Sequence, residues 1–289
     1  MATRKKGFTI IEIMTVVSII AILIALFIPA LAKVRMMVKE TQQKAQLNTI
    51  GLALAAFKND TGDYPPSDFT GTDYEGGQKL AEALLGYDLL GFHPDSDWQA
   101  DGQDLADNDI YVHTGITSAG LYPSEDENLN ERKNIYIENG TKYAFTIEEL
   151  FGSYNQGLEQ NTYVICDVFD FKKIDNASVG APILYYKANI NNKTINYNQS
   201  PFNPENLIYN HEDNEELITA KEEYDNNVQN KDVDHTLNNP ADNYKEFYDF
   251  IHDPKIPDPL RPYRPDTYLL ISAGADGVYG TNDDITNFK

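Results

Sequence analysis

The sequence is poor in cysteine and in basic residues, and each shortage excludes a class of protein. Cys166 is its only cysteine, so an internal disulfide framework is impossible. Lys and Arg number 23 against 45 Asp and Glu, which gives a net charge of −22. Because a phosphate-binding surface needs clustered Lys and Arg, nucleic acid is not expected as a partner. The acidity suits cation binding or simple solubility instead.

Motifs that would indicate catalysis are also missing. The sequence has no G-x-S-x-G, P-loop or dinucleotide fingerprint and no internal repeat. Its five histidines are scattered without metal-ligand spacing, so a transition-metal centre is not expected. We therefore predict that the protein is not an enzyme. The alternative, a membrane-tethered enzyme, would need its chemistry within residues 67–260, where no motif lies.

Charge is absent from one long amino-terminal segment. Between Gly7 and Ala32, Glu12 is the only charged residue, and about 20 apolar residues suffice to span a bilayer. A secretory signal peptide would use Ala30-Leu31-Ala32 as its cleavage site, but its apolar core would be shorter than this run. An ordinary signal anchor fits the length. It leaves Glu12 unexplained unless that side chain reaches the membrane interface, because a carboxylate in hydrocarbon costs roughly 3 kcal/mol.

A third interpretation accounts for more residues at once. The stretch KGFTIIE, residues 6–12, resembles the prepilin peptidase site of type IV pilins and type II secretion pseudopilins. The resemblance implies a leader at residues 1–7, cleavage by prepilin peptidase after Gly7, and N-methylation of Phe8. It also implies that Glu12 pairs with the amine freed at Phe8 of a neighbouring subunit, so that each charge offsets the other's burial. Pro29 stands where members of that class often carry a helix-breaking proline.

The membrane orientation follows from the resemblance and not from counting charges. Basic residues flank the apolar segment about equally on both sides, with Arg4, Lys5 and Lys6 before it and Lys33, Arg35 and Lys39 after it. The resemblance implies a cytoplasmic leader, a single span at residues 8–32 in the bacterial inner membrane, and a head in the periplasm.

The helix is predicted to continue beyond the membrane through residues 33–60. Four apolar residues recur at helical spacing and form a stripe suited to carrying a globular part: Leu47, Ile50, Leu54 and Phe57. Asn59 to Gly62, followed by Pro65 and Pro66, marks the stop. Residues 61–289 then form the globular head.

Within the head, a helix is predicted at Lys79 to Leu90, and strands at Thr162 to Phe171 and Pro182 to Lys187. Two polar stretches, Asn191 to Asn206 and Lys221 to Asn243, are predicted to be long surface loops. The fold class is therefore α+β: a long amino-terminal helix packed on a small antiparallel sheet, with long loop insertions.

The carboxyl terminus carries a second informative pattern. Thr267 to Ser272 reads as a strand and is followed by an acidic, glycine-rich loop from Ala273 to Ile285. Glycines allow a tight turn, and calcium prefers six to eight hard oxygens from carboxylates and carbonyls. The spacing differs from that of an EF-hand, so a solvated acidic loop is the alternative. An earlier run of six aspartates between Asp95 and Asp109 has no regular ligand spacing and is predicted to be a solvated loop, with a second calcium site as the alternative.

The segment 267–289 also resembles the carboxyl-terminal calcium loop of the major pseudopilin of type II secretion, including the ending Ile-Thr-Asn-Phe. The side chains of Asp276 and Asp284 are the first candidates for calcium ligands, and Asp283 is a third. Backbone oxygens near Leu270, Ser272 and Thr281 would complete the shell.

Taken together, the two resemblances imply a structural subunit of a type II secretion pseudopilus. Such a subunit would polymerise with itself through its amino-terminal helix, and with other pseudopilins and the inner-membrane secretion platform, to support protein export. The alternative is a type IV pilin or adhesin subunit of a surface filament.

Overall fold

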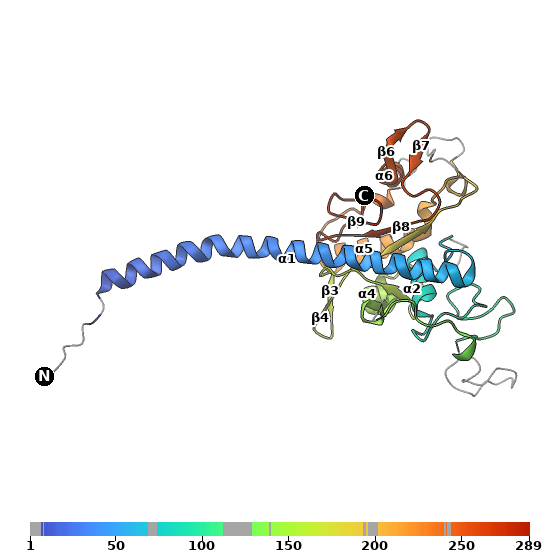
Figure 1. The fold of residues 1–289 in the computed structure, drawn as a ribbon, viewed down its shortest axis with the longest axis horizontal. Coiled ribbons are helices and arrows are strands. Elements are labelled where there is room, and N and C mark those ends of the chain that lie inside the picture. Colours follow the sequence, from blue (N-terminus) through green and yellow to red (C-terminus); the bar gives the residue numbers. More distant parts are fainter. Residues whose placement is uncertain are drawn as a thin grey trace. The chain divides into compact units, whose positions relative to one another are not determined.

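The computed structural model describes residues 7, 9–68, 74–111, 129–138, 140–192, 195, 202–239, 241 and 244–289. The chain divides into two compact units, Met1–Thr41 and Gln42–Lys289. The fold is α+β, as predicted, with one long helix and several small antiparallel sheets (Figure 1).

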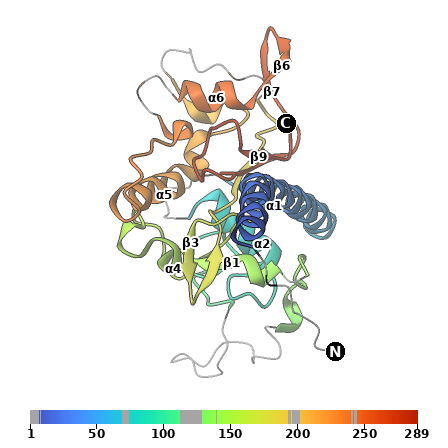
Figure 2. The same cartoon turned by 90° about the vertical axis from the view of Figure 1, so that its left-hand side faces the viewer.

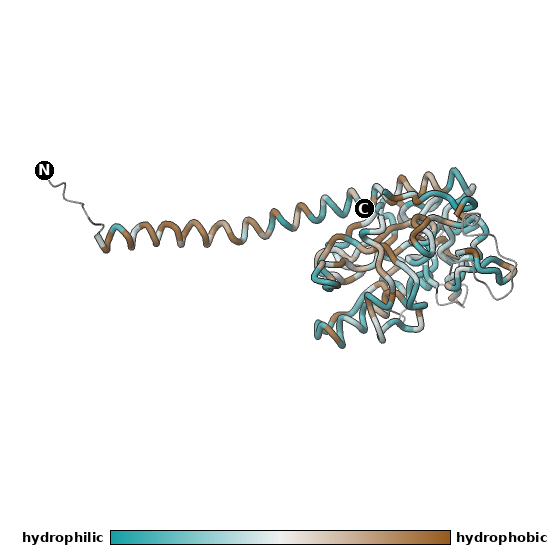
Figure 3. The backbone as a smooth tube through the Cα atoms, turned by 90° about the horizontal axis from the view of Figure 1, so that it is seen from below, coloured by the Kyte–Doolittle hydropathy of each residue, from teal (hydrophilic) through white to brown (hydrophobic). Residues whose placement is uncertain are grey.

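Helix α1 (Ile10–Thr61) contains 52 residues and continues through Pro29. Its apolar amino-terminal part is exposed along its whole length, and Figure 3 shows the hydrophobic colouring running through it. The predicted stripe is confirmed, because Leu47, Ile50, Leu54 and Phe57 are all buried in the second unit. The helix ends inside the predicted stop, where Gly62 adopts a φ of 98° and donates its N–H to the carbonyl of Lys58.

The second unit adds short elements to the carboxyl-terminal part of α1. Its other helices are α2 (Gly76–Leu85), α4 (Ile147–Phe151), α5 (Glu215–Asn227) and α6 (Lys245–Ile251). Its strands are β1 (Ala144–Thr146), β2 (Tyr163–Ile165), β3 (Lys172–Ile174), β4 (Ala177–Val179), β5 (Leu184–Lys187), β6 (His252–Pro257), β7 (Leu260–Pro262), β8 (Tyr268–Ser272) and β9 (Ile285–Thr286). Figure 2 shows α4 and α5 close together beside β3.

The three-stranded sheet β5-β8-β9 is antiparallel and buried on both faces. Side chains alternate across a strand, so Tyr185 and Leu270 join the cluster that contains the α1 stripe and α2. Their neighbours Tyr186 and Leu269 face the other way, into the cluster that contains α4, α5 and α6. Because both faces are covered, β5 and β8 consist mostly of aliphatic and aromatic residues, and β8 ends where the acidic loop begins.

Three predictions for the head need correction. The predicted helix at Lys79 to Leu90 is α2, which begins three residues earlier, at Gly76, and ends at Leu85, because Gly86 turns the chain with a φ of 93°. The predicted strand at Thr162 to Phe171 is ordered as β2 only over Tyr163–Ile165. Beyond β2, the side chain of Asp167 accepts the N–H of Phe169 and bends the chain away.

The prediction of a surface loop at Lys221 to Asn243 is wrong in its first part. Residues up to Asn227 belong to α5, and the side chains of Lys221, Asp225 and His235 are fully buried. The polar composition of this stretch suggested a solvent-exposed loop. In the structure, these side chains contact one another in the interior of the fold, so most of their polar atoms have a partner there.

Candidate functional site

At the amino terminus, Glu12 lies in the first turn of α1 and is exposed. Its Oε2 accepts hydrogen bonds from the backbone N–H and the hydroxyl of Thr9, each at 2.8 Å, and Thr9 Oγ1 accepts the N–H of Glu12 at 3.3 Å. This reciprocal arrangement is a capping box, which satisfies two otherwise free N–H groups at the start of the helix. Gly7 is exposed, and Phe8 lies outside the described residues.

The apolar part of α1 has the length and composition of a membrane span. One 18-residue window has a mean hydropathy of 2.8, and none of it is buried within the protein. Exposed Ile, Leu and Val side chains cover this segment, including Ile20 and Ile24 at 48% and 52% exposure. A helix with this much apolar surface needs a nonaqueous partner, either lipid or another helix.

The acidic loop connects β8 to β9 and depends on three glycines with left-handed backbone, at φ values of 65°, 75° and 93° for Gly274, Gly277 and Gly280. At Gly274 a Cβ would lie 2.3 Å from the carbonyl oxygen of Asp283. The loop therefore closes on itself too tightly for any other residue at this position.

Four of the predicted calcium-site residues are brought together inside this loop. Asp283 Oδ2 accepts the N–H groups of Ala275 and Asp276, and its Oδ1 accepts the hydroxyl of Thr281 at 2.6 Å. Asp284 Oδ2 accepts the N–H of Gly280 at 2.8 Å. Asp276, Asp283 and Asp284 therefore lie in one short loop, where the carboxylates of Asp283 and Asp284 accept hydrogen bonds from N–H and hydroxyl groups of the same loop.

Burial, together with neighbouring carboxylates, raises the pKa of two aspartates in the loop. Burial, reinforced by the charges of Asp276 and Asp283, raises the pKa of Asp284 to about 7. Burial and the neighbouring Asp283 also raise the pKa of Asp276. At Asp283, by contrast, burial is outweighed by hydrogen bonds from Thr281, Asp276 and Ala275, which lower its pKa. Carboxylate oxygens gathered in one loop are ligands that calcium prefers. In the described conformation several of these oxygens accept hydrogen bonds from the loop's N–H and hydroxyl groups, and no group of three or more His, Cys, Asp or Glu among the described residues has metal-binding geometry.

The other two predicted ligands lie in β8, at the base of the loop. Ser272 is fully buried, and its hydroxyl donates to Asp167 Oδ2 at 2.8 Å. The carbonyl oxygen of Leu270 accepts the N–H of Asn287 at 3.3 Å. Both residues anchor the strand from which the acidic loop leaves.

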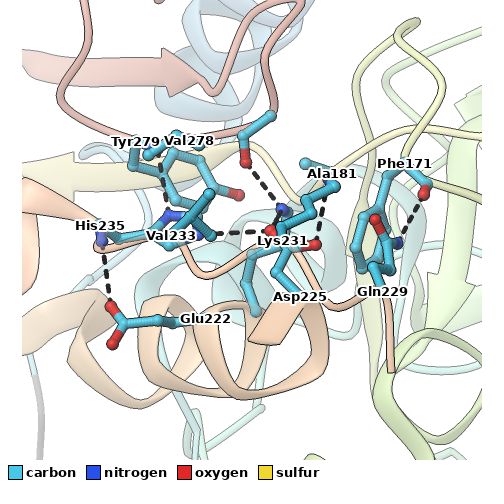
Figure 4. A network of polar contacts seen from close by, with 12 residues as sticks. Phe171, Ala181, Glu222, Asp225, Gln229, Lys231, Val233, His235, Val278 and Tyr279 are labelled. Carbon is cyan, nitrogen blue, oxygen red and sulfur yellow. Dashed lines mark hydrogen bonds and ion pairs between the residues drawn. The ribbon is translucent and has the colours of Figure 1, made fainter. Parts of the chain in front are cut away.

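A buried polar network that sequence reasoning missed holds the acidic loop from its inner side. The ammonium of Lys221 donates to the carbonyl oxygen of Gly277 at 2.7 Å and to Asp225 Oδ2 at 2.5 Å. His235 Nδ1 accepts the N–H of Tyr279 at 3.1 Å, and Figure 4 shows His235 between Glu222 and Tyr279. The i, i+4 spacing of Lys221 and Asp225 was the available signal, since it pairs opposite charges on one helix face.

The charges of this network are set by burial and mutual contact. Burial acts against ionisation of Asp225, but His235, Lys221 and Lys231 together outweigh it and hold the pKa of Asp225 below its usual value. Burial lowers the pKa of His235, and the charges of Lys221 and Lys231 add to that effect. His235 is therefore neutral, with Nδ1 free to accept from the loop.

The aspartates between Asp95 and Asp109 do not form a comparable site. Asp104 accepts the N–H groups of Ala106 and Asn108, and Asp101 accepts that of Gln103, so these carboxylates shape their own turns.

Comparison with known proteins identifies one family. Residues 2–28 match the family described as the prokaryotic N-terminal methylation motif. No curated protein and no solved structure matches the chain. The matched residues include the KGFTIIE stretch and most of the exposed apolar part of α1.

Proposed function

We propose that this chain, whose prepilin methylation motif and long apolar helix fit the type IV pilin-like and pseudopilin class, is a structural subunit of a type II secretion pseudopilus. The observation that carries the proposal is a Gly7-Phe8 junction within the matched methylation motif, followed by a single carboxylate, Glu12, on an otherwise apolar helix segment. Prepilin peptidase would cleave after Gly7, and the mature subunit would stay anchored in the inner membrane with its head in the periplasm. Filament growth from the secretion platform would then support protein export.

In this proposal Glu12 joins neighbouring subunits. Its Oε2 caps its own helix through Thr9, while the carboxylate as a whole stays exposed in the single chain. The amine freed at Phe8 of a neighbouring subunit would supply the missing positive charge. Pairing two charges in an apolar surrounding offsets the cost of burying either one and fixes the axial register between subunits.

Two substitutions separate this pairing from helix capping. Glu12→Gln keeps an oxygen that accepts from Thr9 but removes the charge, whereas Thr9→Ala removes the capping side chain and keeps the charge. We expect Glu12→Gln to abolish filament assembly and Thr9→Ala to reduce it only slightly, as measured by crosslinking and electron microscopy of sheared filaments. Normal assembly of the Glu12→Gln variant would reject the proposed pairing.

The acidic loop favours a secretion pseudopilus within this class, and we propose that it binds calcium. Asp276 and Asp284, with Asp283 as a third carboxylate, would replace their present N–H donors by the cation, and backbone oxygens of Leu270, Ser272 and Thr281 would complete the shell. Calcium would offset the burial and the neighbouring negative charges that raise the pKa of Asp284, and it would fasten the loop to the head.

The calcium proposal is tested by thermal unfolding of the full chain in detergent, with calcium or with a chelator. At a calcium concentration one hundred times Kd, binding stabilises by about 2.7 kcal/mol, which raises Tm by roughly 5–10 °C for a domain of this size. The double variant Asp276→Asn/Asp284→Asn should lose this rise, whereas Asp107→Asn, in the other aspartate-rich loop, should keep it. An unchanged Tm on chelation would refute calcium binding by the loop.

A surface pilin or adhesin is the second candidate function. The observation in its favour is a large cavity in the head. A cavity of about 1020 Å³ is lined by polar side chains including Asp63, Lys187, Asn210 and Asp213, a size and polarity that suit a polar ligand. Filaments longer than the periplasm is deep, seen on the cell surface by immunogold labelling, would support this candidate over the secretion pseudopilus.

A further inference from the structure

The helix segment that follows the apolar span is basic, in a chain that is otherwise acidic. Lys33 and Arg35 come directly after residues 10–32, and no carboxylate occurs between Glu12 and Glu40. Both cations are exposed on α1. Residues three and four positions away are the neighbours of a side chain on a helix surface, and around Lys33 and Arg35 none of these is Asp or Glu. The helix itself therefore supplies no ion-pair partner for either cation.

Apolar side chains that are also exposed lie among these cations. Val34, Met36, Met37 and Val38 are 54%, 42%, 56% and 50% exposed, so the segment 33–38 presents hydrocarbon and positive charge within two turns of helix. Water suits the cations but not the apolar side chains, whereas the interior of a membrane suits only the apolar side chains. A surface that satisfies both kinds of side chain is apolar on one side and anionic on the other.

The position of the segment along α1 matches the headgroup region of a bilayer. At 1.5 Å per residue, Lys33 and Arg35 lie about 1.5 and about 4.5 Å beyond Ala32, where the apolar segment ends. Polar headgroups add roughly 5–7 Å on each side of the hydrocarbon core. A membrane that holds residues 10–32 therefore brings phosphate groups next to both cations.

The orientation in the proposed function makes these cations unusual. It places the flank that contains Lys33 and Arg35 on the periplasmic side, whereas Lys and Arg normally accumulate on the cytoplasmic side of a span. This departure is explained if the two residues bind an anionic group at the periplasmic surface of the membrane.

Given the membrane anchoring of the proposed function, on which this inference rests, we propose that Lys33 and Arg35 form a binding surface for the headgroups of anionic phospholipids such as phosphatidylglycerol. The guanidinium of Arg35 matches two phosphate oxygens at once, and the ammonium of Lys33 adds a point charge. Val34 and Met37 would contact the glycerol and the upper part of the acyl chains. Lipid is favoured over an acidic protein partner because the surface is continuous with the apolar span of the same helix.

The test uses the full chain in phosphatidylcholine bilayers that contain spin-labelled phosphatidylglycerol or spin-labelled phosphatidylcholine. The spectrum separates lipids immobilised at the protein from free lipids and so gives the preference of the protein for the anionic lipid. A cation at the membrane surface changes the binding of an anionic lipid about fivefold. Averaged over the first lipid shell, Lys33→Gln/Arg35→Gln should lower the preference by roughly twofold or more. Arg4, Lys5 and Lys6 are present in every variant, so their own attraction for anionic lipid cancels in the comparison.

Two control variants separate position from charge. Lys44→Gln/Lys58→Gln removes two positive charges from the part of α1 that belongs to the second unit, and should keep the wild-type preference. Lys33→Arg/Arg35→Lys keeps both charges in place and should also keep it. In 1 M sodium chloride, where the Debye length is about 3 Å, the difference between the wild type and Lys33→Gln/Arg35→Gln should disappear.

The inference is overturned if Lys33→Gln/Arg35→Gln keeps the wild-type lipid preference, or if Lys44→Gln/Lys58→Gln loses as much. Unchanged lipid preference together with lost crosslinking between subunits would identify a second copy of the chain as the partner instead. Both substituted residues are exposed, so the variants should fold, which an unchanged Tm of the head would confirm.

Flotation of the wild type with phosphatidylcholine vesicles checks the anchoring separately. A chain that does not float would contradict the proposed function as well as this inference. A chain that floats but shows no preference for phosphatidylglycerol would contradict this inference alone.

Discussion

His235 is one of several ionisable side chains that are fully buried in the head, together with Lys221, Asp225 and Glu75. A buried ionisable group is either paired with a group of opposite charge or present in its uncharged form, because an unpaired buried charge is costly. Lys221 and Asp225 pair with each other, and His235 stays neutral and accepts the N–H of Tyr279. The acidic loop is therefore held by hydrogen bonds that depend on a charged Lys221 and a neutral His235.

Acidification is therefore expected to lower the free energy of unfolding of the head, because His235 becomes protonated. Its pKa is lower in the folded state than in the unfolded chain, so the unfolded chain binds the proton more readily. The contribution of neutral His235 to the free energy of unfolding is complete above the unfolded-state pKa of about 6.5. It is lost as the pH falls below that value, by at most about 1.4 kcal/mol per pH unit. Asp225, whose pKa is also lowered, acts in the same direction only below about pH 4.

The variant His235→Asn keeps an acceptor near the position of Nδ1 and cannot titrate. Its free energy of unfolding should change less between pH 7 and pH 5 than that of the wild type, as measured by chemical denaturation in detergent. His252→Asn, at a partly exposed histidine, should keep the wild-type pH profile. Equal slopes for the wild type and His235→Asn would exclude His235 as the source.

Helices α1 and α5 hold the head together in different ways. The carboxyl-terminal part of α1 contributes an apolar stripe to one core cluster, where burial of hydrocarbon is the main stabilising force. Helix α5 contributes Leu217 and Ile218 to the other cluster but also a buried ion pair, which reaches the carbonyl of Gly277 in the acidic loop. The two helices therefore respond differently to substitution.

In α1, Leu54→Ala should destabilise the head by about 2–5 kcal/mol, because it removes a fully buried side chain and leaves a cavity. Leu52→Ala, two residues away and 74% exposed, should change stability by no more than about 0.5 kcal/mol. Urea denaturation of the monomer in detergent measures both. Comparable losses for the two variants would contradict the packing of α1 on the head.

In α5, Lys221→Met should cost about 3–5 kcal/mol, because it leaves the buried carboxylate of Asp225 without its closest partner. The acidic loop should also become more accessible, which hydrogen exchange at Gly277 to Gly280 would detect. Lys245→Met removes one partner of the exposed pair Lys245–Asp249 and should cost no more than about 1 kcal/mol. Unchanged exchange in Lys221→Met would show that the ammonium does not hold the loop.

The whole chain combines two units with opposite solvent requirements. The first unit exposes an apolar helix and has a net charge of +4, from six Lys and Arg against two Glu, whereas the second unit is strongly acidic and accounts for the net negative charge of the chain. One part therefore favours hydrocarbon and the other water, which is the property expected of a membrane-anchored protein.

Membrane anchoring is expected to fail when charge is introduced into the span. Ile20→Lys/Ile24→Lys places two ammonium groups in the apolar segment, each costing about 2.5–3.5 kcal/mol at the centre of a helix. The variant should move from the membrane pellet to the soluble fraction after alkaline carbonate extraction. Leu52→Lys, also in α1 but in the second unit, should stay in the pellet; retention of both proteins would rule out residues 10–32 as the anchor.

The amino-terminal motif, the long helix and its buried stripe were all predictable, because each depends on local patterns. The stripe follows from helical spacing, and the end of α1 follows from Gly62, which is free to adopt positive φ. The tight turn of the loop that carries Asp276, Asp283 and Asp284 was equally predictable, because three glycines with positive φ allow one short loop to fold back on itself.

Contacts between residues far apart in the sequence could not be predicted in the same way. Lys221 and Asp225 looked like part of a solvated loop, since a single sequence does not reveal that Gly277 and His235 lie beside them. Glu75 and Glu216 are 141 positions apart, and only the packing of α2 against α5 makes them walls of one cavity. The sequence by itself determined the anchor, the helix and the acidic loop, because chain geometry and local composition suffice for them. The tertiary structure alone decided which charges are buried together, because burial and long-range pairing depend on the complete fold.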